Sequence, residues 1–299
     1  MLGTLPPFEY YAPSTLEEAS GLMERLDGDV SLFAGGTDLL VAMKEGRLKP
    51  RALIDIKHIP EVGAIRVDNG GLRIGAAVTA RAIARSPAVR ERFPLLPQSL
   101  TILGSMQIGN RATVGGNLAN ASPAADSAPP LLALRASVKL VSPKGERWVS
   151  LENFFLGPGK TVTDREVLTE VHIPPPPSQG RGIFYKLGPR GAPEDICIVN
   201  AAVFAVPDRA GRIWEDVRIA LGAVAPTPIR ARYAEEALRG RPMEGKAIED
   251  AARLAAEKDA RPITDIRGSA NYRRAMVQVL VARALEHVAR EVKGGPRYE

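Results

Sequence analysis

The 299-residue sequence has a single cysteine, Cys197, and only three histidines. One cysteine cannot form a disulfide within the chain, and it cannot hold an iron–sulphur cluster by itself. Cys197 lies in the apolar run 196–204, where we expect an inert thiol in the protein core. The histidines stand far apart, at His58, His172 and His287, so no histidine metal triad is predicted. The sequence therefore predicts no metal site in this chain.

Long apolar runs and clustered charge are also absent, and aromatic residues are few. No apolar run reaches the roughly 18 residues of a membrane helix, and the first residues lack the basic-then-apolar order of a secretory signal. We therefore expect a cytoplasmic protein with no membrane span. The net charge is +6, but only 5% of residues are aromatic and the basic residues are scattered. This pattern argues against nucleic acid as a partner, whereas an acidic partner protein would suit the charge.

The common nucleotide-binding signatures are absent as well. No G-x-G-x-x-G opens a predicted helix. Gly159-Lys160-Thr161 resembles the end of a Walker A loop, but Phe154 stands where the first glycine of that loop belongs. A Rossmann dinucleotide fold and a P-loop are therefore not predicted.

What the chain does contain is a segment at 113–126 that reads T-V-G-G-N-L-A-N-A-S-P-A-A-D, without Lys or Arg. Its paired glycines and Pro123 interrupt the pattern of an amphipathic helix and weaken a strand. We expect a tight loop whose exposed peptide N–H groups bind an anion such as pyrophosphate. The alternative is a plain turn rich in Gly and Asn. We call this stretch the second glycine segment.

The first glycine segment is Ala34-Gly35-Gly36-Thr37-Asp38, which follows an apolar strand candidate at Val30–Phe33. A short helix is predicted after it, with Thr37 as its N-cap and Gly46 at its end. A glycine turn that leads into a helix N-terminus can bind an anion. The alternative is a strand-to-helix turn with no ligand.

Together these segments carry a resemblance. A-G-G-T-D-L at 34–39 and T-V-G-G-N-x-x-x-A-S-P at 113–123 resemble the flavoprotein (medium) subunit of the molybdenum hydroxylases, such as carbon monoxide dehydrogenase and the bacterial xanthine dehydrogenases. Further matching pieces occur in order along nearly the whole chain: I-G-A-A-V-T at 74–79, F-F-L-G-P-G at 154–159, the segment 185–196, and D-I-R-G-S-A-N-Y-R-R at 265–274.

The resemblance implies an α+β fold with two domains. A two-part FAD-binding domain of the vanillyl-alcohol oxidase type would span 1–176, with sub-lobes at about 1–60 and 61–176. A small α+β domain of the CO dehydrogenase flavoprotein type would span 177–299. The residues themselves favour this boundary, because the consecutive prolines at 174–177 form a stiff extended linker.

Beyond that linker the sequence predicts three strands followed by three helices, which is typical of a sheet covered on one face. The expected strands lie at 182–187, 196–206 and 213–222, and the expected helices at 229–238, 246–258 and 269–290.

The resemblance also assigns FAD contacts to particular residues. It places the first glycine segment on one side of the pyrophosphate, namely Ala34, Gly35, Gly36, Thr37 and Asp38. It places part of the second glycine segment on the other side, namely Thr113, Gly116 and Asn117. Two loops of N–H donors would hold a diphosphate without a lysine.

Three further residues are assigned to the rest of the cofactor. Asp126 would lie near the adenosine end, as an unpaired carboxylate suited to a sugar hydroxyl; alternatively it caps the helix predicted from Ala128. Leu168 would lie beside the flavin ring, or it is an ordinary core residue. Lys186 would reach the pyrimidine edge of the ring and raise its potential, or it is an exposed lysine on an edge strand.

No side chain is predicted as a nucleophile or general base, so the flavin would carry the chemistry. FAD would be bound non-covalently, because no histidine lies near either glycine segment. The resemblance implies a hetero-oligomer with a small 2Fe–2S subunit and a large molybdopterin subunit. Electrons would pass from the 2Fe–2S subunit through FAD to NAD⁺, a quinone or another acceptor. Two alternatives are a self-sufficient FAD-dependent oxidase or reductase of the same fold, and a non-enzymatic scaffold that has lost the cofactor.

Overall fold

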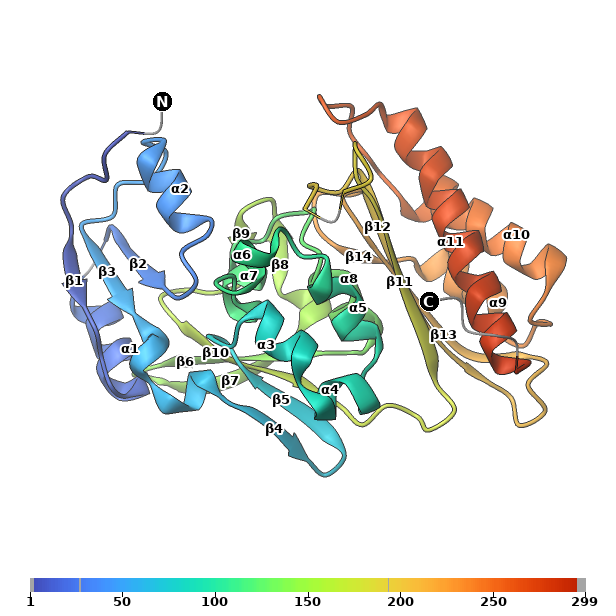
Figure 1. Cartoon of the computed structure of the whole chain (residues 1–299), viewed down its shortest axis with the longest axis horizontal. Helices are drawn as coiled ribbons and strands as arrows, with labels where there is room; N and C mark the ends of the chain where they lie inside the picture. The colour runs from blue at the N-terminus through green and yellow to red at the C-terminus, as the bar shows by residue number, and fades with distance from the viewer. Residues whose placement is uncertain (1–2, 27, 193, 295–299) are drawn as a thin grey trace.

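The computed structural model describes residues 3–26, 28–192 and 194–294. Three main sheets follow one another along the chain, and each has helices packed on it. Figure 1 shows them side by side as an N-terminal lobe in blue, a middle lobe in cyan and green, and a C-terminal domain in yellow to red. The mixture of helices and sheets confirms the predicted α+β class.

The N-terminal lobe is a three-stranded parallel sheet in the order β1-β3-β2. The central strand β3 is buried along its whole length, as its apolar sequence A-L-I-D predicts for a parallel strand. The first glycine segment connects β2 to α2. The elements of this lobe are β1 (Glu9–Tyr11), α1 (Leu16–Arg25), β2 (Val30–Phe33), α2 (Leu39–Lys44) and β3 (Ala52–Asp55).

The middle lobe is built on a five-stranded antiparallel sheet in the order β4-β5-β10-β6-β7. Its strands are β4 (Ile65–Asp68), β5 (Gly71–Gly75), β6 (Ser137–Ser142), β7 (Gly145–Ser150) and β10 (Val167–Ile173), with a small hairpin of β8 (Phe155–Gly157) and β9 (Lys160–Thr161) beside it. Its helices are short: α3 (Ala80–Arg85), α4 (Pro87–Arg92), α5 (Leu95–Thr101), α6 (Met106–Gly109), α7 (Val114–Ala119) and α8 (Ala128–Ala133).

The C-terminal domain has an antiparallel sheet whose inner strands are mostly buried, because both faces of the sheet are covered. One face packs on the helices, chiefly α11. The other face contributes Phe184, Ala202 and Phe204 to the core of the middle lobe. The elements are β11 (Arg181–Leu187), β12 (Val199–Pro207), β13 (Trp214–Gly222), β14 (Ile229–Arg230), α9 (Arg232–Leu238), α10 (Gly245–Leu254), a π-helical turn (Ala255–Asp259) and α11 (Ala270–Val292).

One detail of the predicted C-terminal domain is wrong. The sheet has four strands rather than three, because Ile229–Arg230 pairs with β13 opposite Leu221 and Ala220. The helix predicted from 229 therefore begins only at Arg232. The pairing partner lies in another part of the chain, so the local pattern could not reveal it.

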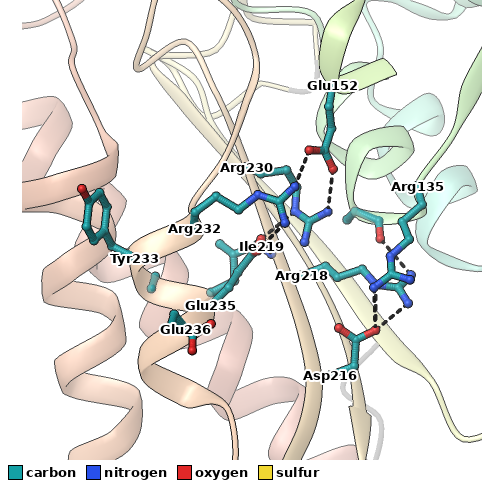
Figure 2. Close-up of polar contacts among 12 residues, drawn as sticks. Arg135, Glu152, Asp216, Arg218, Ile219, Arg230, Arg232, Tyr233, Glu235 and Glu236 are labelled. Carbon is teal, nitrogen blue, oxygen red and sulfur yellow. Dashed lines mark hydrogen bonds and ion pairs between the residues drawn. The ribbon is translucent and has the colours of Figure 1, made fainter. Parts of the chain in front are cut away.

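Charged side chains join the middle lobe to the C-terminal domain, as Figure 2 shows. Glu152 of the middle lobe accepts hydrogen bonds from Arg230 and Arg232 of the C-terminal domain. Arg230 also donates to the buried Glu235 at 2.6 Å, and Glu235 accepts from the backbone N–H of Ile219 at 2.8 Å. Because Arg230 and Glu235 are buried and each has more than one bonding partner, the network specifies how the two parts dock.

Candidate functional site

The two glycine segments come from different lobes, and the first lies against the residues that directly precede the second. A Cβ atom added to Gly35 would stand 2.2 Å from the carbonyl oxygen of Arg111 and 3.1 Å from the Cα atom of Ala112. Real side chains do not approach backbone atoms so closely, so only glycine permits this contact. The turn after β2 is therefore packed on the residues that lead into the second glycine segment.

A cavity of about 770 Å³ opens beside this contact. Its wall includes every predicted cofactor residue except Lys186, namely Ala34, Gly35, Gly36, Thr37, Asp38, Thr113, Gly116, Asn117, Asp126 and Leu168. Residues up to about 130 positions apart in sequence are thus brought to one cavity by the tertiary fold. Their individual contacts with a cofactor remain predictions.

The first glycine segment presents unused hydrogen-bond donors to the cavity. In the described part of the chain, no hydrogen bond uses the backbone N–H of Gly35, Gly36 or Thr37. Gly36 has φ of +74°, a conformation that L side chains rarely adopt. Consecutive free N–H groups in such a turn form a site for an anion.

The predicted N-cap of α2 is wrong by one residue. Asp38 rather than Thr37 occupies the cap position, and its side chain makes no capping hydrogen bond. Gly46 does end this region with a positive φ of +72°. Partial desolvation raises the pKa of Asp38, and the charge of Arg47 opposes that rise.

The second glycine segment differs from its prediction in a way that matters for binding. Instead of a loop, residues Val114–Ala119 form the short helix α7, with Thr113 as its N-cap. The Thr113 Oγ1 atom accepts from the backbone N–H of Gly116 at 3.1 Å. The N–H of Val114 donates to Val78, and that of Gly115 donates to the carbonyl oxygen of Ala76. The prediction that this segment offers free N–H donors at its glycines is therefore wrong.

What the second glycine segment offers the cavity is space and one side-chain amide. A Cβ atom added to Gly116 would meet only Thr113 Oγ1 within 4 Å, at 2.9 Å. The Oδ1 atom of Asn117 accepts from the hydroxyl of Ser127 at 2.5 Å, which fixes the orientation of the Asn117 side chain. Its NH₂ group is the donor then left for a ligand.

Asp126 is not the unpaired carboxylate that was predicted. It is 7% exposed, and its Oδ2 atom accepts from Lys186 Nζ at 2.7 Å while Oδ1 accepts from Asn200 Nδ2 at 3.1 Å. Nor does it cap α8, whose N-cap position is Ser127. Burial raises the pKa of Asp126, and the Lys186 ammonium opposes that rise.

Lys186 is neither exposed nor part of the cavity wall. Its side chain is 3% exposed, and Nζ donates to the carbonyl oxygen of Ile102 at 3.1 Å as well as to Asp126. The lysine therefore reaches the cavity only through Asp126, and it ties β11 of the C-terminal domain to the second glycine segment. Its predicted contact with the ring edge remains a prediction.

Sequence reasoning missed the charged residues at the cavity rim. Three of them, Arg47, Arg165 and Glu166, come from connecting loops that match no motif. Glu194 and Asp195 lie in the segment 185–196, which carries part of the resemblance but was assigned no cofactor contact there. Arg165 has a positive φ of +53°, which no sequence signal announces for a non-glycine residue.

Asp195 is 4% exposed, and hydrogen bonds from the backbone N–H and guanidinium of Arg190 lower its pKa. The described cavity wall contains no histidine, cysteine, tyrosine or lysine.

Two kinds of feature are absent from residues 3–26, 28–192 and 194–294. No group of His, Cys, Asp or Glu side chains there could hold a metal ion. None of the helices in those ranges has the length and apolar character needed to cross a membrane.

Comparison with known proteins gives one consistent result. The family described as "FAD binding domain in molybdopterin dehydrogenase" matches residues 6–176, and the "CO dehydrogenase flavoprotein C-terminal domain" matches residues 183–288. The carbon monoxide dehydrogenase medium chain of Hydrogenophaga pseudoflava is 36% identical over 281 residues, covering 94% of this chain and 96% of that protein. A putative xanthine dehydrogenase FAD-binding subunit of Escherichia coli K12 is 31% identical over 288 residues, covering 95% and 97%.

A solved structure of carbon monoxide dehydrogenase from Hydrogenophaga pseudoflava superposes with a TM-score of 0.91 at 35% identity, covering 97% of this chain and 99% of that chain. The fold, the paired glycine segments and these matches over nearly the whole length agree. The chain therefore belongs to the FAD-binding medium subunits of the molybdenum hydroxylase family, and it is an oxidoreductase flavoprotein subunit.

Proposed function

We propose that the chain holds FAD non-covalently in the 770 Å³ cavity and relays electrons from a small 2Fe–2S subunit to a terminal acceptor. A large subunit with a molybdenum–pterin centre would oxidise the substrate of the complex. The observation that carries the proposal is the single cavity lined by both glycine segments, with unused N–H donors on the first segment. The names of the relatives, which are medium chains and FAD-binding subunits, support it.

The residues fit a dinucleotide flavin through different means on the two sides. The N–H groups of Gly35, Gly36 and Thr37 would donate to the diphosphate, which needs no lysine when several N–H groups converge. On the other side, Gly116 leaves room for close approach, and the Asn117 NH₂ group would donate. Leu168, which is 5% exposed, would give the ring an apolar surface.

When bound, FAD supplies the exchange of electrons between one-electron and two-electron carriers. The protein would position the ring and set the charge around it. Lys186 is already neutralised by Asp126 at 2.7 Å, so it would stabilise negative charge on the ring less than a free ammonium would. The catalytic contribution of this chain would thus be electrostatic and positional, without a protein acid or base.

The division of labour along the chain is part of the same proposal. Residues 1–176 would form the FAD-binding domain and residues 177–299 the C-terminal domain, which contributes Glu194, Asp195 and Ile196 to the cavity wall. Assembly with the two partner subunits would take place in the cytoplasm.

Titration of the purified chain with FAD tests the proposal. We expect one FAD per chain, released on denaturation because no covalent bond holds it. Purification from the native source should also recover one small cysteine-rich subunit and one large subunit. A chain that binds no FAD would contradict the proposal. Reduction of the bound flavin by a small organic substrate, without partners, would instead support a self-sufficient oxidase or reductase.

A further inference from the structure

The segment D-I-R-G-S-A-N-Y-R-R at 265–274 has no role in the cavity, yet the fold holds it rigidly. Arg273, at the start of α11, is 1% exposed. One of its nitrogens donates to the carbonyl oxygen of Ile198 at 2.7 Å and to that of Ala223 at 2.9 Å. The other donates to Asp265 at 2.5 Å. A buried arginine thus ties the loop before α11 to the start of β12 and the end of β13.

Asp265 is the second part of this anchor. Its partial burial would raise its pKa, but hydrogen bonds from the backbone N–H and guanidinium of Arg267, together with Arg273, lower the pKa to about 2. The carboxylate is therefore charged at any physiological pH, and the loop stays anchored.

This anchored loop displays apolar side chains to solvent. Ile266 is fully exposed, Ile263 is 70% exposed and Tyr272 is 44% exposed. We call these three side chains the apolar knob. A rigid loop that exposes apolar groups loses little conformational entropy on docking and gains by burying them. Such a surface has the properties of a protein interface.

The surroundings of the knob are basic. Between residues 260 and 276 the sequence holds one carboxylate, Asp265, which is paired, against four arginines at 261, 267, 273 and 274. Arg261 and Arg274 are exposed at its rim. A partner surface that is apolar at its centre and acidic at its edge would complement this arrangement.

The loop that carries the knob packs on the segment that leads from the cavity wall into β12. A Cβ atom added to Gly268 would lie 3.5 Å from the Ile198 side chain, and Arg273 holds the Ile198 carbonyl oxygen. Two residues earlier, Ile196 lines the cavity and is 63% exposed. In Figure 1 the loop before α11 projects beyond the upper ends of β11 and β12. A protein docked there would lie beside the cavity entrance.

We infer that the apolar knob and its basic rim are the docking surface for an acidic face of the iron–sulphur subunit. This inference rests on the proposed electron relay, because the subunit that exchanges electrons with the cofactor must dock close to the cavity. It adds to the proposed function the surface of this chain that recognises that partner.

The test measures the affinity of the FAD-loaded chain for the purified iron–sulphur subunit. Ile266→Asp places a like-signed charge against an acidic partner and removes the apolar contact, so we expect at least a tenfold loss of affinity. Arg274→Glu should lower the affinity less, and it should weaken the salt dependence of binding. The matched control is Val67→Asp, a similar change at a 41% exposed residue on β4, which lies at the lower edge of Figure 1. It should leave the affinity within twofold.

The side chain of Ile266 makes no buried contact, so FAD content and thermal unfolding of Ile266→Asp should match those of the unmodified chain. Unchanged affinity of this variant for the iron–sulphur subunit would overturn the inference. So would a loss confined to the large subunit or to self-association. Absence of FAD from the unmodified chain would instead contradict the proposed function. The two outcomes therefore distinguish a failure of the docking inference from a failure of the proposed function.

Discussion

The two glycine segments look alike in sequence, but they do different physical work. In the first segment the N–H groups of Gly35, Gly36 and Thr37 have no protein acceptor among the described residues. In the second, the N–H groups of Gly115 and Gly116 are already used, by Ala76 and by the cap Thr113. Hydrogen-bond donors that the fold has satisfied cannot also bind a ligand at no cost. One segment supplies donors and the other supplies a packed wall.

In each segment the first glycine packs against backbone atoms, and the second faces side chains instead. Gly35 touches the backbone of Arg111, and Gly115 touches Ala76, where an added Cβ atom would lie 2.5 Å from the Ala76 side chain. Gly36 and Gly116 face fewer backbone neighbours and line the cavity. The segments also differ in how they are joined to the C-terminal domain. Among the described residues, only the second segment has a buried ion pair to that domain, between Asp126 and Lys186.

The largest expected effect comes from breaking that ion pair. Lys186→Met would leave Asp126 buried without its counter-charge, so we expect the free energy of unfolding to fall by about 3 kcal/mol. Urea denaturation measures this change. The double variant Asp126→Asn/Lys186→Met removes both charges and should recover most of the lost stability. If the free energy of unfolding of Lys186→Met lies within about 1 kcal/mol of that of the unmodified chain, Asp126 does not depend on a buried counter-charge.

The next prediction compares Gly35, which packs against the backbone of Arg111, with Gly116 of the helix α7. Gly35→Ala would press a methyl group into the backbone of Arg111, which we expect to cost about 1–3 kcal/mol of stability and to lower FAD affinity at least tenfold. Gly116→Ala should lower FAD affinity as well. Alanine favours a helix interior, but its Cβ atom would lie 2.9 Å from the Thr113 Oγ1 cap atom, so the stability should change by less than about 1 kcal/mol. Thermal unfolding of the cofactor-free chains and FAD titration measure both effects, and equal destabilisation by the two variants would refute the distinction.

The two threonines sharpen the comparison further. Thr113→Val removes the N-cap acceptor of α7 and should cost about 1 kcal/mol of stability. Thr37 makes no such cap, so Thr37→Val should change stability by less than about 0.5 kcal/mol. It should also leave FAD affinity nearly unchanged, because valine keeps the backbone N–H that would donate to the diphosphate. The opposite pattern in calorimetry and FAD titration would reverse the roles assigned to the two segments.

The smallest effect concerns pH and Asp38. Its pKa is raised in the folded chain, so its carboxylate destabilises the fold at neutral pH, and that penalty disappears once pH falls below the ordinary carboxyl pKa. Asp38→Asn should therefore raise stability slightly at pH 7, by less than about 0.5 kcal/mol, and make no difference at about pH 3. It should also strengthen FAD binding at pH 7, because an anion near the diphosphate is removed. Melting curves and FAD titrations of both chains at the two pH values measure these changes. An effect of Asp38→Asn that is the same at pH 7 and at about pH 3 would contradict this account.

Much of the fold could be predicted because its signals are local. The apolar strand at Val30–Phe33 and the glycine turn after it need only neighbouring residues, and so does the long helix capped by Ser269. The start of α9 could not be predicted, because Ile229–Arg230 forms a strand that pairs with β13. The helix α7 was missed for a related reason. Paired glycines disfavour a helix unless close packing, here against Ala76, requires them.

The sequence by itself determined the family and the α+β architecture, and it pointed to the two glycine segments that line the cavity, since these follow from local motifs in a particular order. Only the tertiary structure decided which groups remain available there. Whether an N–H group is free, or Asp126 is paired, depends on atoms from distant parts of the chain, such as Ala76, Asn200 and Lys186. Hydrogen-bond satisfaction is a property of three-dimensional neighbours, and no pattern of residue types records it.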